Sequence, residues 1–265
     1  MFRNKFNLRK VVAIAICLAG TTVLSGCGNE NDDGSNDGKE FLTCDKIHSS
    51  ASTFTTLNVQ AFDLQIGGRT NADYLKSDTR LSFIANTIVD GTSKSFIVAE
   101  SEYKSENLIL TFKDAPNGYL AELISDAYDL NAKKIEGRKT IYALSEQWYS
   151  ETDFENLNIS NKNIKTTKIY YGWIFISPKT TPWHGDFYAT MGLANIDCDS
   201  GGWFVYCDSN CEITGYIPKY SGSSEMININ ILLRKGWNKV FNLGDRIITT
   251  DNIKDSHLYW YSYAG

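Results

Sequence analysis

The sequence predicts a mainly β protein, built as two β-sandwich-like domains. Three observations predict this fold class: apolar and polar residues alternate in many short runs, turn-forming dipeptides separate those runs, and no long segment has the periodicity of an amphipathic helix. The chain of 265 residues is long enough for two sandwiches of about 100–120 residues each. One large sandwich or an open barrel is the alternative architecture.

Residues 1–26 have the pattern of a secretory signal peptide. Four basic residues and no acidic residue stand in this segment, and an apolar run from Val11 to Leu24 is interrupted only by glycine and threonine. The run is too short to cross a bilayer as a helix, which needs about 20 residues. A basic start followed by a short apolar run is typical of a signal peptide.

The end of this segment carries a more specific signal. Leu24-Ser25-Gly26-Cys27 resembles the lipobox of bacterial lipoproteins. The resemblance implies that Cys27 receives diacylglycerol, that the signal is cut before it, and that the new amine is acylated. Two or more acyl chains anchor a protein stably to a membrane. Gly28 follows in place of the aspartate that retains some lipoproteins in the inner membrane, which favours the outer membrane or cell surface.

Residues 27–42 are expected to form a flexible acidic tether. Residues 28–40 contain no large apolar side chain, so burial cannot offset the entropy lost on ordering them. Removing residues 1–26 leaves a net charge of −9, because four basic and no acidic residues are lost from a chain of net charge −5. An acidic chain without a Lys/Arg cluster is not expected to bind nucleic acid.

The N-terminal β domain is assigned to residues 43–150. The strand with alternating Leu57, Val59 and Ala61 comes first, and Asp90-Gly91 and Asn117-Gly118 suit the tight turns of two later hairpins. A short helix is expected near Asp126–Lys134. The hairpin strands are predicted at Leu81–Val89, Phe96–Tyr103, Leu108–Phe112 and Tyr119–Ile124.

The C-terminal β domain is assigned to residues 151–265 and is rich in aromatic residues. All six tryptophans of the chain lie after residue 145. Lys168–Ile176 is apolar on both faces and is expected to be a central strand. In Met226–Leu233, isoleucines alternate with Asn228 and Asn230, which predicts a strand with one largely polar face. Further strands are predicted at Trp203–Tyr206, Glu212–Ile217 and His257–Tyr263.

One segment of this domain has a second resemblance. Leu233-Arg234-Lys235-Gly236-Trp237-Asn238, following Tyr206 and Ile213-Thr214-Gly215, resembles the C-terminal region of uncharacterised exported bacterial lipoproteins. The resemblance implies no activity. Physically, Lys235-Gly236 is expected to turn the chain, so that Trp237 folds back under the sheet and Asn238 bonds to local backbone.

Four cysteines remain in the mature chain: Cys44, Cys198, Cys207 and Cys211. An even number in an exported protein favours disulfides. Cys207 and Cys211 enclose three residues between two predicted strands, so a hairpin loop would place them opposite each other at a separation that a disulfide tolerates. Cys44 is then left to pair with Cys198. Cys207 and Cys211 are the only close pair among the four cysteines and the three histidines are scattered, so no metal is expected.

The candidate binding segment is the loop Pro182–Asp186. Trp183 offers an aromatic platform for a sugar, and His184 and Asp186 offer polar groups beside it. Pro182 and Gly185 are expected to keep the segment out of a strand. The segment lacks a nucleophile or a second carboxylate, and the chain contains none of the common hydrolase, metalloprotease or nucleotide-binding motifs.

The sequence therefore predicts a membrane-anchored, non-catalytic module without cofactor that binds glycan or protein through its C-terminal half. A structural or assembly subunit of an envelope complex is the alternative, and an extracellular polymer hydrolase is a further one.

Overall fold

The computed structural model describes the larger part of the chain after residue 41. The described ranges are 42–61, 79–89, 91–104, 107–129, 133–141, 143–144, 147–169, 172–178, 185–193, 196–197 and 201–262. The predicted signal peptide, Cys27 and nearly all of the predicted tether lie outside these ranges. Lys39–Gly265 form one compact unit. No helix among the described residues is long and apolar enough to cross a membrane.

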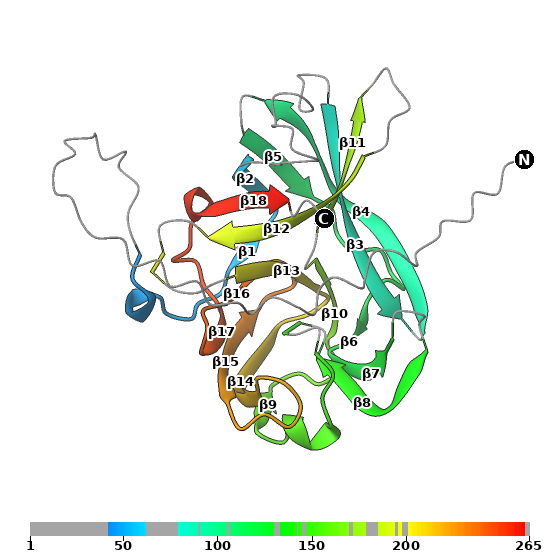
Figure 1. The fold of residues 1–265 in the computed structure, drawn as a ribbon, viewed down its shortest axis with the longest axis vertical. Helices are drawn as coiled ribbons and strands as arrows, with labels where there is room; N and C mark the ends of the chain where they lie inside the picture. Colours follow the sequence, from blue (N-terminus) through cyan, green and yellow to red (C-terminus); the bar gives the residue numbers. More distant parts are fainter. Residues whose placement is uncertain are drawn as a thin grey trace, which may run out of the picture. The chain divides into compact units, whose positions relative to one another are not determined.

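The protein is mainly β, as the sequence predicts (Figure 1). The strands up to residue 150 are β1 (Thr53–Phe54), β2 (Thr56–Ala61), β3 (Thr79–Val89), β4 (Thr92–Lys104), β5 (Asn107–Phe112), β6 (Ala121–Glu122), β7 (Ile124–Tyr128) and β8 (Lys134–Ile141). The later strands are β9 (Leu157–Ile159), β10 (Lys165–Ile169), β11 (Gly172–Pro178), β12 (Gly185–Leu193), β13 (Gly201–Cys207), β14 (Cys211–Pro218), β15 (Met226–Leu233), β16 (Gly236–Asn242), β17 (Arg246–Thr249) and β18 (Leu258–Ser262). Within the described ranges, three short 3-10 helices accompany them: η2 (Cys44–Lys46), η3 (Glu151–Phe154) and η4 (Asp255–His257).

The strands pair into one large curled sheet, and β7 and β8 form a separate hairpin. The main path of the sheet runs β11-β3-β4-β5-β2-β18-β12-β13-β16-β17-β15-β14-β9. Strand β11 pairs with β12 as well as with β3, so the first seven strands of the path close into a ring. The path then leaves this ring at β12 and continues into the strands drawn in the lower part of Figure 1.

Strands β13 and β16 lie between two hydrophobic cores. Along β13, Phe204 and Tyr206 pack into one core, whereas Trp203, Val205 and Cys207 pack into the other. Successive side chains of a strand point to opposite faces of the sheet, which explains this alternation. The strand is buried along both faces and therefore lacks the apolar–polar alternation of a surface strand.

The predicted domain boundary at residue 150 does not separate the two cores. The core that contains Phe204 and Trp237 also contains Leu57 and Leu110 from the first half of the chain. Strands pair directly across the boundary as well, since β1 pairs with β16, β6 with β10 and β2 with β18. The two halves of the chain therefore fold together.

Several predicted strands and one predicted turn are confirmed. The residues on either side of Asp90-Gly91 pair directly, Val89 with Thr92, and Gly91 has a φ of 73°, as a tight hairpin turn requires. In β15 the isoleucines at 227, 229 and 231 are buried and the asparagines between them are exposed. This arrangement is the polar-faced strand that the sequence predicts.

The prediction for Trp237 and Asn238 is also confirmed. Gly236 has a φ of 103° and starts β16, and Trp237 is buried in the core behind it. The Asn238 amide donates to the carbonyls of Arg234 at 2.7 Å and Gly236 at 2.9 Å. Its Oδ1 accepts the Arg234 N–H at 2.9 Å. The side chain therefore holds the tight connection between β15 and β16.

Three local predictions are wrong. The segment predicted as a helix at Asp126–Lys134 is part of the β7–β8 hairpin, because pairing with β8 satisfies its backbone. The strand predicted at Lys168–Ile176 divides into β10, which pairs with β13, and β11, which pairs with β3. The strands on either side of Asn117-Gly118 do not form a hairpin, since β5 pairs with β2 and β4.

Candidate functional site

The predicted binding loop is only partly described. Trp183 and His184 lie outside the described residues. Gly185 and Asp186 begin β12, where Asp186 pairs with Phe175 of β11. The expectation that the whole segment stays out of a strand is therefore wrong at its C-terminal end, because β11 satisfies the backbone there. A binding role for Trp183, His184 and Asp186 stays a prediction.

Two of the tryptophans whose side chains the structure describes belong to the cores. Trp203 and Trp237 are 4% and 2% exposed. Each indole donates its Nε1–H to a backbone carbonyl from the first half of the chain, Trp203 to Ala143 at 2.9 Å and Trp237 to Lys113 at 2.8 Å. Trp148, by contrast, is 47% exposed. The richness of the C-terminal half in tryptophan therefore reflects core packing as well as surface.

The predicted Cys207–Cys211 disulfide is not formed. Both residues are free, buried cysteines. Their strands are not neighbours, since β16, β17 and β15 lie between β13 and β14 in the sheet, so no hairpin sets the two side chains opposite each other. The Cys207 thiol donates to the Arg234 carbonyl at 3.0 Å, and the Cys211 thiol to the Asn161 carbonyl at 3.5 Å.

Burial raises the pKa of the Cys207 thiol to about 12, although a hydrogen bond from Asn238 acts in the opposite direction. A thiol with so high a pKa is neutral at physiological pH and a poor nucleophile or metal ligand. Within the described ranges, no group of three or more His, Cys, Asp or Glu side chains is placed to hold a metal ion.

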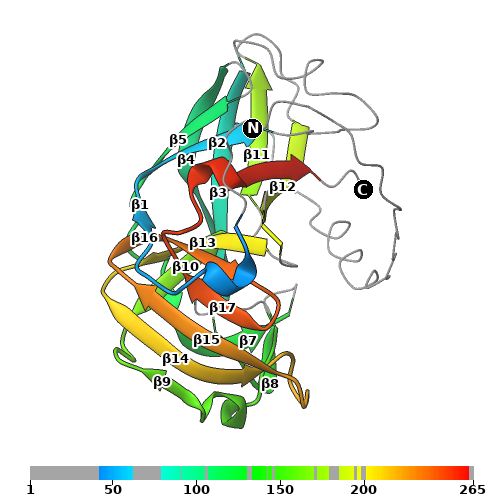
Figure 2. The same ribbon diagram turned by 90° about the vertical axis from the view of Figure 1, so that its left-hand side faces the viewer.

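An exposed sheet face combines tyrosine with side-chain amides. We call it the tyrosine–asparagine face and define it by Asn158, Thr214, Tyr216, Asn228 and Asn230, which are all exposed. Register brings them together: Thr214 lies between Asn158 of β9 and Asn230 of β15, and Tyr216 lies opposite Asn228. Figure 2 shows β15, β14 and β9 side by side in the foreground. Among the described residues, none of these five side chains has a hydrogen-bond partner.

The turn between β14 and β15, at one end of this face, carries Tyr220, which is 56% exposed. Within the turn, the Ser223 N–H donates to the Tyr220 carbonyl at 2.9 Å. Side chains of η3 and β8 also bind the turn. Ser221 Oγ donates to Asp153 of η3 at 3.1 Å and accepts from Arg138 of β8 at 2.7 Å. Tyr220 therefore projects from a fixed turn.

Gly215 sets the position of β9 beside this face. It has a φ of 124°, and a Cβ built on it would lie 2.0 Å from the carbonyl oxygen of Asn156. Only glycine allows the backbone of β14 to approach the segment before β9 so closely. This close approach places Asn158 of β9 directly beside Thr214 of β14.

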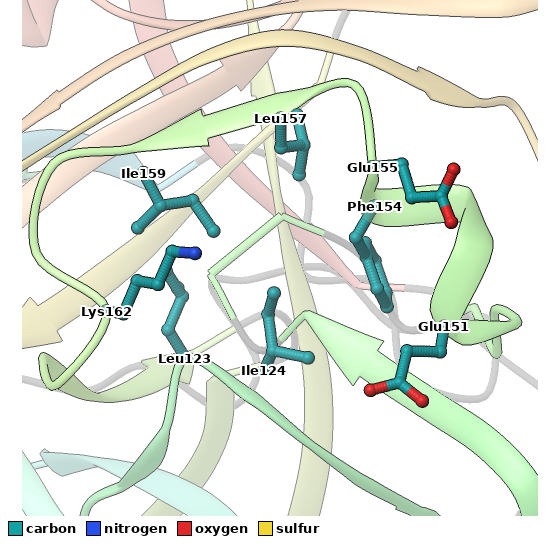
Figure 3. A pocket seen from close by; sticks show the side chains of 8 residues that line it. All are labelled: Leu123, Ile124, Glu151, Phe154, Glu155, Leu157, Ile159 and Lys162. Atoms are coloured by element: carbon teal, nitrogen blue, oxygen red, sulfur yellow. The ribbon is translucent and has the colours of Figure 1, made fainter.

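A second feature is an apolar groove of about 350 Å³ beside η3 and β9, drawn in Figure 3. Its lining is Leu123, Ile124, Glu151, Phe154, Glu155, Leu157, Ile159 and Lys162. The carboxylates of Glu151 and Glu155 flank Phe154 on one side of the hollow, and the ammonium of Lys162 lies on the other. The groove thus offers an apolar floor with both signs of charge at its margin.

The sequence predicts part of the tyrosine–asparagine face. The polar side of Met226–Leu233 was evident from its alternation, which singles out Asn228 and Asn230. Tyr216 and Asn158 were missed, because only the pairing of three strands brings them into line with those asparagines.

Comparisons with protein family models, with curated proteins and with solved structures found no match.

Proposed function

We propose that the protein is an exported lipoprotein, anchored through Cys27 to the outer membrane or cell surface, and that it works there as a non-catalytic binding module. The lipobox and the signal pattern before it support the anchor. The predicted acidic tether would suit a module held away from the membrane surface, because its sequence has no large apolar side chain to bury.

The tyrosine–asparagine face is the observation that supports the binding role. Tyr216 is 51% exposed on a sheet that is buried and packed on its other side. Exposed aromatic side chains on a rigid scaffold combine apolar area with a polar tip, and they lose little conformational entropy on binding. We infer that ligand contacts are made here, in addition to any at the predicted Trp183 loop.

Cysteine chemistry supports an extracytoplasmic location. Cys44 is disulfide-bonded, and disulfides persist mainly in oxidising compartments. The Cys44 N–H donates to Asp197 Oδ1 at 2.6 Å, and the Asp197 N–H donates to the Leu42 carbonyl at 3.2 Å. Because Cys198 directly follows Asp197 in the sequence, we propose Cys198 as the partner of Cys44.

The test is fractionation and intact-mass analysis of the native protein. We expect a membrane-associated chain that begins at Cys27 and carries added acyl mass. The Cys27→Ser variant is expected to stay unprocessed or to be shed, whereas Cys207→Ser leaves anchoring unchanged. A wild-type chain that keeps residues 1–26, or a free Cys27 thiol on membrane-extracted protein, would contradict the proposal.

A second candidate function is a subunit of an envelope complex. The apolar groove favours it, because its leucine, isoleucine and phenylalanine floor suits an apolar anchor residue of a protein partner. Co-purification of a stoichiometric partner that is lost in Leu157→Asp but kept in Asn158→Asp would favour this function over the binding module.

A further inference from the structure

We propose that the tyrosine–asparagine face binds a neutral polysaccharide chain that lies flat across β9, β14 and β15. This inference rests on the proposed binding function and names its ligand class and site. It is carried by the arrangement of hydrogen-bonding side chains, by the charge around the face and by the exposed tyrosines.

The face presents two parallel rows of side chains. Asn158, Thr214 and Asn230 form one row across three strands, which spans about 10 Å because neighbouring strands lie about 4.8 Å apart. Tyr216 and Asn228 form the next row, about 6.8 Å further along the strands. A long, flat ligand can therefore touch both rows at once without any cavity.

The hydrogen-bonding chemistry of the face matches sugar hydroxyls. An asparagine amide offers both donors and an acceptor, and a threonine hydroxyl offers both functions in one group. A sugar hydroxyl likewise donates and accepts. Within the described part of the chain, no side-chain hydrogen bond is made by Asn158, Asn228 or Asn230. A ligand therefore need not displace an internal hydrogen bond.

One ion pair stands at each end of the β14–β15 hairpin. Glu212 lies 3.7 Å from Arg234 at one end of the β14–β15 hairpin, and Lys219 lies 3.0 Å from Glu225 at the other. The five defining side chains between these pairs carry no charge. An array that is polar and uncharged complements a neutral ligand better than a polyanion or a polycation.

The tyrosines supply the apolar part of the contact. Tyr216 stands on the face itself, and Tyr220 projects from the turn at its end. An aromatic ring packs against the C–H groups of a sugar ring while its hydroxyl stays with the polar groups around it. A protein partner would instead be expected to meet an apolar centre, but the centre here is asparagine and threonine.

The experiment uses the full chain, with its lipid retained in detergent, and affinity electrophoresis in gels that contain one polysaccharide each. The neutral probes are xylan, a mixed-linkage glucan, mannan and dextran, and the charged probes are polygalacturonate and chitosan. We expect retardation by at least one neutral probe. Tyr216→Ala should lower that affinity about tenfold, and Asn228→Ala combined with Asn230→Ala by a similar factor.

Trp148→Ala is the matched control, because Trp148 is 47% exposed and lies outside the face. It should bind like the wild type, and thermal midpoints should show that all variants fold. Binding to charged probes alone, to no probe, or equally by wild type and Tyr216→Ala would overturn the inference, as would retention of a protein partner by this face. Such a result would not contradict the proposed lipid anchor, which fractionation and mass analysis test separately.

Discussion

The Trp237 indole donates its Nε1–H to the backbone carbonyl of Lys113 over 2.8 Å, although 124 positions separate the two residues. Trp237 also packs edge-on against Phe112 and Tyr206, with ring centroids 5.4 Å apart in each case. A buried indole fills a large volume, and its N–H needs a hydrogen-bond acceptor. This contact therefore joins the first half of the chain to β16.

Trp237→Phe is expected to lower the free energy of unfolding by about 1–3 kcal/mol, because the hydrogen bond to Lys113 and part of the buried ring volume are both lost. Trp237→Ala should cost about 3–5 kcal/mol, since it also opens a cavity. Chemical denaturation followed by circular dichroism measures both values. Trp148→Phe, at an exposed position, should change stability by less than about 0.5 kcal/mol. Equal effects at the two positions would show that the indole contact contributes nothing.

Gly215→Ala is expected to destabilise the protein by at least about 2 kcal/mol, because the new Cβ meets the Asn156 carbonyl oxygen at 2.0 Å and the φ of 124° suits glycine. Gly137→Ala is the control for backbone strain alone. Gly137 has a φ of 67° but no atom within 4 Å of its Cβ position, so its cost should stay near 1 kcal/mol. Similar costs for the two substitutions would contradict the close approach at Gly215.

Cys207 is expected to resist thiol reagents in the folded protein. With a pKa of about 12, about one molecule in ten thousand carries the thiolate at pH 8. Labelling at pH 8 should modify Cys207 only after denaturation. The free energy of unfolding should also fall as the pH rises above about 9, because the Cys207 thiol ionises at a lower pH in the unfolded protein than in the folded one. Cys207→Ala should remove part of that fall. Rapid labelling of Cys207 in folded protein, or a Cys207–Cys211 disulfide peptide, would contradict this view.

Asp126 is held by two lysines of β8, Lys134 at 2.7 Å and Lys139 at 2.9 Å. Their hydrogen bonds, with Lys134 the larger contributor, hold the pKa of the Asp126 carboxyl below its ordinary value. Its contribution to stability is therefore present at neutral pH and is lost as the pH falls through the lowered pKa. Asp126→Asn should be slightly less stable than wild type at pH 7 and equal to it in strong acid. A constant difference at all pH values would rule out the ion pairs as its cause.

The sequence predicts local features of this fold better than its long-range pairings. The alternation in β15 and the Asp90-Gly91 turn depend on neighbouring residues, so both can be read directly. The Cys207–Cys211 hairpin looks equally plausible locally, but it is absent because β13 pairs with β16 and β10 instead. Sequence patterns indicate that a strand exists and which face is apolar, but they do not name its partner.

The same limit applies to the candidate site. Tyr216 and Asn158 belong to one surface only because β14 pairs with both β9 and β15. An abundance of tryptophan pointed to the C-terminal half, yet Trp203 and Trp237 are buried by strands that pack on both faces. Burial on both faces depends on the whole fold and cannot be judged from one segment.

The proposed Cys44–Cys198 disulfide is the long-range link that we expect to contribute most to stability. It would close a loop of more than 150 residues, and in the chain-entropy model such a loop stabilises the folded state by up to about 5 kcal/mol. Peptide mapping without reductant should recover Cys44 joined to Cys198, and Cys44→Ser and Cys198→Ser should lower the midpoint of thermal unfolding equally. Combining the two substitutions should add little, because either one already breaks the bond. A free Cys198 in the native protein, or additive effects of the two substitutions, would contradict this pairing.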